Sequence, residues 1–332
     1  MKKIPLWFFL AVFCAAAGAA RAQPVLNVYT YDSFASDWGP GPRIKTAFES
    51  VCECELNFVA VDGSAGILSR VRFEGASSRA DVVLGLDTSL MAEAKRGGLL
   101  APHDAPLDAL ALPVEWNDPV FLPFDYGYFA FIYDREKLPS PPASFRELVA
   151  ADDSLKIIIQ DPRSSTPGLG LMLWVKSLYG GGAAEVWKKL AGKITAVTGG
   201  WSQAYGMFLD GEADMVLSYT TSQAYHAAAG DERYRAAAFA EGHGMQIEVA
   251  ARLKNAPNPE LARRFMRFIV SEEFQSAIPE GNWMYPATRI QGGLPASFAN
   301  VPRPARALGM DPQRIADNKA EWVDEFSRAL RR

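Results

Sequence analysis

The sequence predicts an α/β protein whose two lobes enclose a ligand cleft and are joined by hinge strands. Apolar strand-like runs alternate with helical patterns along most of the chain, which is typical of parallel sheets covered by helices. About 310 residues remain after an N-terminal targeting segment, and this length exceeds one ordinary core. Because 49% of the residues are hydrophobic, the chain can bury two cores.

The first residues are typical of a secretory signal peptide. Lys2 and Lys3 precede an apolar run over residues 4–20, and the sequence Ala-Arg-Ala at 20–22 fits a small-residue cleavage site. We therefore expect residues 1–22 to be removed and the exported chain to begin at Gln23. A transmembrane anchor is the alternative, but the run is short and leads directly into the cleavage pattern.

The charge balance argues against a nucleic-acid partner. The chain has a formal net charge of −4, and loss of the leader, which holds three basic residues and no acid, takes it to −7. A nucleic-acid-binding protein would need a basic face. An acidic protein mildly attracts a cationic ligand instead.

The first hundred residues predict one lobe built on a parallel sheet, because three strands alternate with three helices. In the first helix, Ile44, Phe48 and Val51 share one face. The third helix ends at the glycine pair 97–98. The expected strands are residues 25–30, 56–61 and 81–86, and the expected helices are 43–51, 66–74 and 90–96.

A long aromatic run over residues 120–133 interrupts this alternation, and we expect it to cross between the lobes as a strand. Residues 245–251 alternate again and are expected to return to the first lobe. The second lobe is expected to hold strands 156–160 and 213–219 and helices 145–150, 169–179, 184–190 and 202–209.

After the returning strand, Asn258-Pro259 opens a further helix, and the charged tail over residues 312–332 is expected to be helical. The predicted division assigns residues 23–125 and about 245–285 to lobe 1. Residues 126–244 and about 286–332 are assigned to lobe 2.

The loop that starts at Asp161 offers the strongest physical signal for a site. Thr166 suits a helix N-cap, and Pro167 suits the first helical position. The backbone N–H groups of Gly168 and Leu169 would then face outward beside the hydroxyls of residues 164–166. Such a helix start can hold a phosphate or another anion. An ordinary capped helix is the alternative.

Aromatic residues gather at strand and helix ends, where open α/β sheets bind ligands. Their faces hold flat rings by stacking and cations by the ring quadrupole. Core packing is the alternative for each ring alone, but four clusters beside Gly, Pro, Ser or Thr indicate a pocket. The clusters are Tyr29, Tyr31, Phe34 and Trp38; Trp201 and Tyr205; Tyr219 and Tyr225; and Trp283 and Tyr285.

Several acids stand at or near strand ends, where a carboxylate could neutralise a cation or accept from an amino group. An N-cap or an Asx-turn is the alternative for each. The candidates are Asp32, Asp37, Asp62, Asp87 and Asp125.

Signatures of catalysis and of metal binding are missing from the sequence. It holds no nucleophile elbow, zinc-protease motif, P-loop or Rossmann glycine pattern, so we expect neither an enzyme nor a cofactor. His103, His226 and His243 are scattered, and no metal site is expected. Cys52 and Cys54 could form a tight disulfide in an oxidising compartment, with zinc binding as the less favoured alternative.

Long strings of the sequence carry a resemblance to a known family. They are YTYDSFASDWGPGP (29–42), ADVVLGLD (80–87), PFDYGYFAF (123–131), QDPRSSTPGLGL (160–171), WSQAYG (201–206), LSYTTS (217–222), AYH (224–226), EVAAR (248–252) and AIPEGNWMYP (277–286). The chain resembles the thiamine-binding periplasmic proteins of bacterial ABC transporters. The resemblance implies the type II periplasmic binding fold and a periplasmic monomer. It also implies delivery of thiamine, thiamine monophosphate or thiamine diphosphate to a membrane permease.

The resemblance further implies which residues meet the two rings of the ligand, an aminopyrimidine and a cationic thiazolium. Asp62 and Gly63 would engage the polar edge of the pyrimidine. Tyr225, Trp283 and Trp38 would stack on the rings or face the thiazolium.

The remaining implied contacts lie toward the hydroxyethyl or phosphate tail. Ser165 and Thr166 would hold the phosphate, and the Trp201 N–H would add a donor. The Tyr219 hydroxyl would add a further donor. The other implied ligand-binding residues are Thr220, Thr221 and Ser222.

The implied mechanism is capture by closure: one lobe binds the ligand, the lobes close, and the closed form docks on the permease. The ligand drives closure only by binding the closed form more tightly. Two alternatives stay open. One is a receptor of the same fold for ferric ion or another small solute, with tyrosine phenolates as ligands. The other is a thiamine-phosphate hydrolase, for which no activated nucleophile is visible.

Overall fold

The computed structural model describes residues 23–331, in which twelve strands form one sheet. Eight of them follow the order β2-β1-β3-β10-β5-β8-β6-β7. Four short strands pair beside this path: β4 (Leu100–Ala101), β9 (Tyr234–Ala236), β11 (Tyr285–Pro286) and β12 (Ala307–Leu308). The predicted signal peptide lies outside the described residues. No helix among residues 23–331 is long and apolar enough to cross a membrane.

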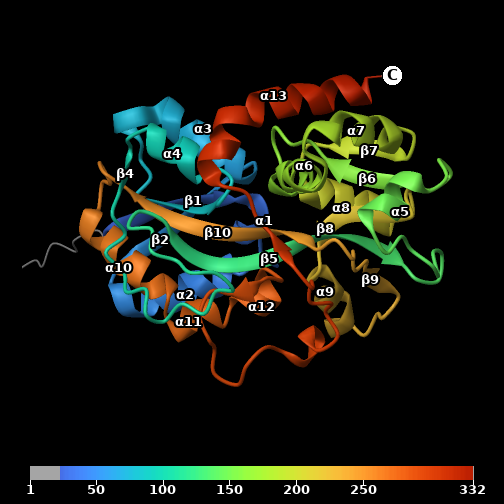
Figure 1. The fold of residues 1–332 in the computed structure, drawn as a ribbon. Helices are drawn as coiled ribbons and strands as arrows, with labels where there is room; N and C mark the ends of the chain where they lie inside the picture. The colour runs from blue at the N-terminus through green and yellow to red at the C-terminus, as the bar shows by residue number, and fades with distance from the viewer. Residues whose placement is uncertain (1–22, 332) are drawn as a thin grey trace, which may run out of the picture.

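One half of the sheet is built from the first hundred residues. The parallel strands β1 (Val25–Tyr31), β2 (Glu55–Val61) and β3 (Val82–Asp87) lie in the order β2-β1-β3. In Figure 1, α3 (Gly63–Glu74) and α4 (Met91–Arg96) cover its upper face. The lower face is covered by α2 (Gly41–Cys52), α10 (Pro259–Ile269) and α11 (Glu272–Gln275).

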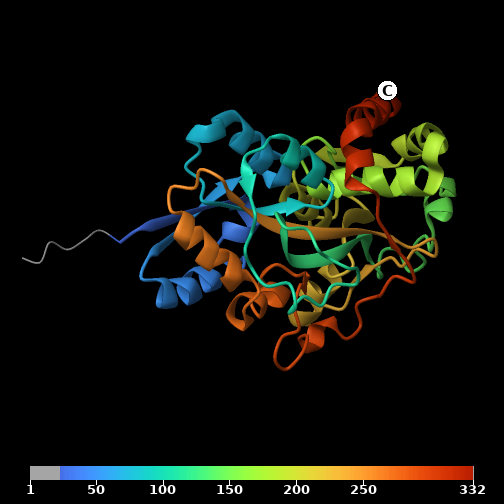
Figure 2. The same cartoon turned by 60° about the vertical axis from the view of Figure 1, so that its left-hand side comes forward.

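Two long strands join this half to the other. The first part of β5 (Leu122–Asp134) pairs antiparallel with β10 (His243–Leu253), and its last residues pair with β8 (Met215–Tyr219). Figures 1 and 2 show both strands passing between two groups of helices. The predicted crossing and returning strands are therefore confirmed.

The other half contains β8 together with β6 (Ile157–Gln160) and β7 (Ile194–Thr198), which run parallel to one another. The short strand β9 (Tyr234–Ala236) pairs with β5. The helices around this half are α5 (Phe145–Ala150), α6 (Thr166–Tyr179), α7 (Ala183–Ala191), α8 (Trp201–Leu209) and α9 (Ser222–Ala228).

The predicted strands and helices are present, and most differences lie at their ends. Helix α3 begins at Gly63 rather than at residue 66, since Gly63 adopts a φ of 59° that lets the chain turn directly into the helix. Strand β7 and helix α9 were not predicted, because both are short: β7 has five residues and α9 has seven.

The C-terminal helix α13 (Pro312–Leu330) packs on α4 and on α7 and therefore touches both halves (Figure 1). Lys319 pairs with Glu93 on the α4 side, and Lys176 of α6 approaches Glu325 to 2.8 Å on the other side. The predicted assignment of residues to two lobes stays a prediction.

Cys52 and Cys54 form a disulfide at the end of α2, and both side chains are buried. This pairing answers the question that the sequence left open. Between them, Glu53 turns the chain with a φ of 54°.

Loss of this disulfide is expected to lower the free energy of unfolding by less than about 2 kcal/mol, because it closes a loop of only three residues. Urea unfolding of a Cys52→Ala/Cys54→Ala variant, measured against the oxidised wild type, tests this. Reduced wild-type protein is the control that keeps both cysteine side chains. A loss above about 4 kcal/mol would contradict the loop-closure argument.

Candidate functional site

A cavity of about 530 Å³ lies between the two halves of the molecule. One side is lined from the ends of β1 and β2 and the start of α3, and the other from the starts of α6, α8 and α9. Residues 281–284 and Glu248 of β10 complete the wall. Strand ends and helix starts therefore converge on one cleft, as expected for an open α/β sheet.

Most of the predicted site residues line this cavity. They are Trp38, Asp62, Gly63, Ser165, Thr166, Trp201, Tyr219, Ser222 and Trp283. Three others do not line it. Thr220 and Thr221 are fully buried in the turn before α9, and Tyr225 lies outside the wall with its ring edge-on to Trp283 at 5.4 Å.

The start of α6 corrects one local prediction. Ser165, not Thr166, is the N-cap, because its backbone is extended whereas Thr166 is already helical. The N–H of Leu169 donates to the Ser165 carbonyl at 2.9 Å, so it does not face outward as predicted. The Ser165 side chain makes no capping hydrogen bond.

Thr166 connects the two halves of the molecule. Its hydroxyl lies 2.8 Å from Ser64 Oγ and 3.3 Å from Asp87 Oδ2, both of which belong to the first half. Beside this contact, the Ser164 carbonyl comes so close to Gly63 that a Cβ there would lie 2.9 Å from it. The structure therefore describes a closed cleft.

Two tryptophan rings at the cleft wall, Trp38 and Trp283, differ in how much other side chains cover them. Trp38 is 59% exposed at the cleft, and Trp283 packs in parallel on Phe298 with ring centroids 6.5 Å apart. Trp283 holds a φ of 53°, a conformation that is rare outside glycine and that is often found at functional sites.

Two predicted hydrogen-bond donors are already engaged. The Trp201 Nε1–H donates to Ser218 Oγ at 2.7 Å, and the Tyr219 hydroxyl donates to Gln246 Oε1 at 2.9 Å. In this conformation the two groups therefore position the ring walls rather than offer free donors to a ligand.

A row of three buried carboxyls crosses the middle of the sheet. Glu248 of β10 is in register with Asp87 of β3 on one side and with Asp125 of β5 on the other. Their exposed fractions are 6%, 2% and 0%, respectively. Of the three, Glu248 lines the 530 Å³ cavity. We refer to these residues as the carboxyl row.

Hydrogen bonds hold the carboxyl row in place. Tyr31 Oη donates to Glu248 at 2.6 Å, and Gln246 Nε2 donates to its other oxygen at 2.9 Å. Asn282 Nδ2 donates to Asp125 Oδ2 at 2.6 Å and also lies 3.3 Å from Glu248. The second oxygen of Asp125 is buried with no partner.

Burial dominates the ionisation of the carboxyl row, because it penalises the charged form. It raises the pKa of Glu248 to about 7, assisted by the charge of Asp87. Burial and the charge of Glu248 raise the pKa of Asp125 well above its usual range. Burial also raises the pKa of Asp87.

The sequence prediction named Asp87 and Asp125 as acidic candidates but missed Glu248 and Asn282. A usable signal was present for Glu248, which stands between Ile247 and Val249 in an otherwise apolar strand. An acid at such a position must lie in a special environment, because buried carboxylates are rare without a partner.

Within residues 23–331, no group of three His, Cys, Asp or Glu side chains could hold a metal ion. His226 and His243 are buried and hydrogen-bonded to Tyr205 Oη and the Phe129 carbonyl, and burial lowers the pKa of His226 to about 4.

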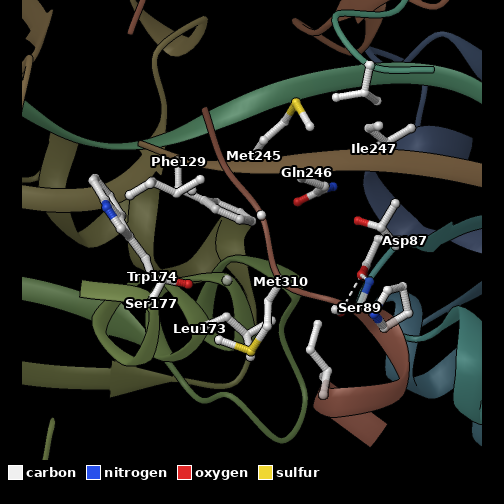
Figure 3. Close-up of a pocket in the computed structure, with 18 of the residues that line it drawn as sticks. Asp87, Ser89, Phe129, Leu173, Trp174, Ser177, Met245, Gln246, Ile247 and Met310 are labelled. Atoms are coloured by element: carbon white, nitrogen blue, oxygen red, sulfur yellow. Dashed lines mark hydrogen bonds between the residues drawn. The ribbon is translucent and has the colours of Figure 1, made fainter. Parts of the chain in front are cut away.

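A second, smaller cavity of about 210 Å³ lies near the hinge strands (Figure 3). Its labelled lining is largely apolar and includes Phe129, Trp174, Met245 and Met310. Thr166 lines both cavities and so stands between them.

Comparisons with known proteins point in one direction. Residues 43–276 match the family "Bacterial extracellular solute-binding protein". The chain is 53% identical over 312 residues to the thiamine-binding periplasmic protein of Escherichia coli (strain K12), covering 94% of this chain and 95% of that one. It is 40% identical over 334 residues to the protein of the same name from Haemophilus influenzae, covering 99% of each.

Solved structures agree with these sequence similarities. A structure named periplasmic thiamin binding protein matches with a TM-score of 0.91 and 52% identity, covering 93% of this chain and 97% of that one. Iron-bound HitA from Pseudomonas aeruginosa matches with a TM-score of 0.73 but only 21% identity, covering 92% and 99%. The second likeness therefore concerns the fold alone.

Proposed function

Because this chain belongs to the bacterial extracellular solute-binding proteins, we propose that its cleft receives thiamine and that the loaded protein delivers this vitamin to an ABC importer. The chain is a periplasmic solute receptor and not an enzyme. Its fold is the two-lobed type II periplasmic binding fold.

One observation carries the choice of ligand: the cleft combines aromatic rings with a buried carboxyl row. Trp38 and Trp283 offer flat faces at the wall, and Glu248 offers an acid that makes no ion pair with any basic residue of 23–331. Thiamine carries two flat rings, one of which is a permanently cationic thiazolium, so it matches both features. An anionic solute would meet Glu248 without compensation.

Closure then follows from differential binding. The ligand contacts residues of both halves, and the Thr166–Ser64 contact joins the halves beside it. A ligand that touches both sides binds the closed form more tightly and shifts the population toward it. We further propose that the closed monomer is the form that the permease recognises.

Titration of ligand-stripped protein tests the function directly. Calorimetry with thiamine, thiamine monophosphate, thiamine diphosphate and ferric citrate is expected to show micromolar or tighter binding of at least one thiamine form. Binding of ferric citrate with no response to any thiamine form would reject the proposal. Rapid phosphate release from the diphosphate would favour a hydrolase instead.

We also propose that the hydroxyl end of the cleft accepts the phosphate of a phosphorylated ligand. Ser165 lies at the start of α6, lines the cavity and makes no capping bond. Helix starts favour anions. Thr166, in contrast, uses its hydroxyl between the two halves.

This difference separates two alanine variants. Ser165→Ala is expected to weaken thiamine monophosphate about tenfold, the usual cost of a hydrogen bond to a charged group, and to spare thiamine. Thr166→Ala is expected to weaken both ligands by similar factors, because it removes a contact of the closed form. If calorimetry shows that Ser165→Ala loses as much affinity for thiamine as for thiamine monophosphate, Ser165 does not hold the phosphate.

A further inference from the structure

The carboxyl row has no basic partner that could explain its burial. Among residues 23–331, no ion pair involves Asp87, Asp125 or Glu248. Like charges directly opposite on neighbouring strands repel each other. Three adjacent carboxylates in the middle of a sheet therefore cannot all be charged in the empty cleft.

The hydrogen bonds show which member is held neutral. Asp125 is fully buried, and within residues 23–331 no donor reaches its Oδ1, so the charged carboxylate is poorly stabilised and the neutral acid is favoured. Glu248 instead receives hydrogen bonds from Tyr31, Gln246 and Asn282. Such donors favour a carboxylate, whereas burial and Asp87 oppose it.

We propose that Glu248 is the residue that selects a cationic ring, and that its carboxyl loses a proton to solvent when the cation enters the cleft. The O–H bond breaks, its electron pair stays on the carboxylate, and the new negative charge faces the positive ring. Asp125 keeps its proton in both states. This inference deepens the proposed function and rests on thiamine, or another ring cation, being the ligand.

The surroundings of Glu248 contain the other groups that can titrate or carry charge. Tyr31, Tyr219 and Asp87 approach it from β1, β8 and β3, and Asp125 approaches from β5. Burial keeps the pKa of both tyrosines well above 10, so they stay neutral. Lys319 acts on Asp87 at longer range and lowers its pKa.

The direction of the pH effect follows from this arrangement. In the closed cleft without a bound cation, Glu248 is mostly protonated below about pH 7, and a bound cation favours its charged form. Affinity for a fixed cation therefore rises with pH up to about 7 and levels off above it. This coupling makes binding at pH 6 weaker than at pH 8 by up to about tenfold.

Calorimetry measures this coupling. Unphosphorylated thiamine is the probe, since a phosphate monoester titrates near pH 6 and would add its own protons. Titrations at pH 7 in phosphate and in Tris, whose ionisation enthalpies differ, are expected to show release of about half a proton per thiamine. A series at pH 6, 7 and 8 is expected to show this rise in affinity.

Variants assign the effect to Glu248. Glu248→Gln is expected to bind thiamine about tenfold more weakly at pH 8, with no proton release and a flat pH profile. Asp87→Asn is expected to move the midpoint to lower pH, because it removes a repelling charge. Asp134→Asn is the matched control: it replaces a buried aspartate on β5, the strand that carries Asp125, outside the cavity, and is expected to keep the wild-type profile.

A neutral analogue of thiamine, with carbon in place of the thiazolium nitrogen, tests charge selection. It is expected to bind wild-type protein more weakly than thiamine, to release no proton and to lose little further affinity in Glu248→Gln. Thiamine binding without proton release in the wild type overturns this inference and leaves the proposed function standing. No binding of any thiamine form defeats the proposed function itself.

Discussion

Replacement of Gly63 by alanine is expected to weaken ligand binding about 5- to 150-fold while the protein stays folded. A Cβ at this position would lie 2.9 Å from the carbonyl oxygen of Ser164, which belongs to the other half of the molecule. Backbone atoms on both sides prevent easy relaxation, and overpacking of this kind costs about 1–3 kcal/mol. The clash destabilises the closed form but not an open form, so it raises the free energy of closure and weakens ligand binding.

Gly75→Ala provides a matched control for this prediction. Gly75 ends the same helix with a φ of 57°, close to the 59° of Gly63, but no atom lies within 4 Å of its would-be Cβ. Both variants place an alanine at a positive φ, and Gly75, with a ψ of −133°, lies in a region that only glycine adopts readily. Thermal unfolding should therefore show a loss of stability in both variants, whereas calorimetry should show weaker binding for Gly63→Ala alone. Equal affinities in the two variants would contradict the closure argument.

Replacement of Trp283 by alanine is expected to lower affinity for thiamine by on the order of 30-fold. Trp283 lines the cavity, and Phe298 and Tyr225 hold its ring by parallel and edge-on contacts. A ring that is fixed in advance loses little entropy when a cation stacks on it. A desolvated cation–π contact is worth about 2 kcal/mol, which is this fold-change.

Two further variants separate the ring from its backbone. Glycine adopts a φ of 53° without backbone strain, so Trp283→Gly is expected to be more stable than Trp283→Ala. Both variants are expected to bind thiamine equally weakly. Phe73→Ala removes an aromatic ring that is 93% exposed and outside the cavity, and its affinity should match the wild type. Full affinity in Trp283→Ala, by calorimetry, would exclude a role for this ring.

Most of the site was visible in the sequence because its residues stand at element ends. Gly63 and Trp201 open helices, and Trp38 lies in the loop over residues 36–40; in an open α/β sheet such positions converge on one edge. Thr220 and Thr221 occupy a similar position, but the turn into α9 buries them. Which side of a turn faces a cleft depends on its backbone angles, and residue type does not specify these.

Local periodicity was sufficient to predict the order and kind of most of the longer strands and helices, since alternation and the 3.6-residue repeat arise within each segment. The carboxyl row depends on a different kind of information. Asp87, Asp125 and Glu248 are distant in sequence and meet because three strands pair in one register. A shift of one residue would turn Glu248 to the opposite face of the sheet. The fold class and most of the cleft's side chains therefore follow from short-range pattern. The shared burial of three acids, and the approach of Gly63 to Ser164, follow from strand register and closure, which no single segment encodes.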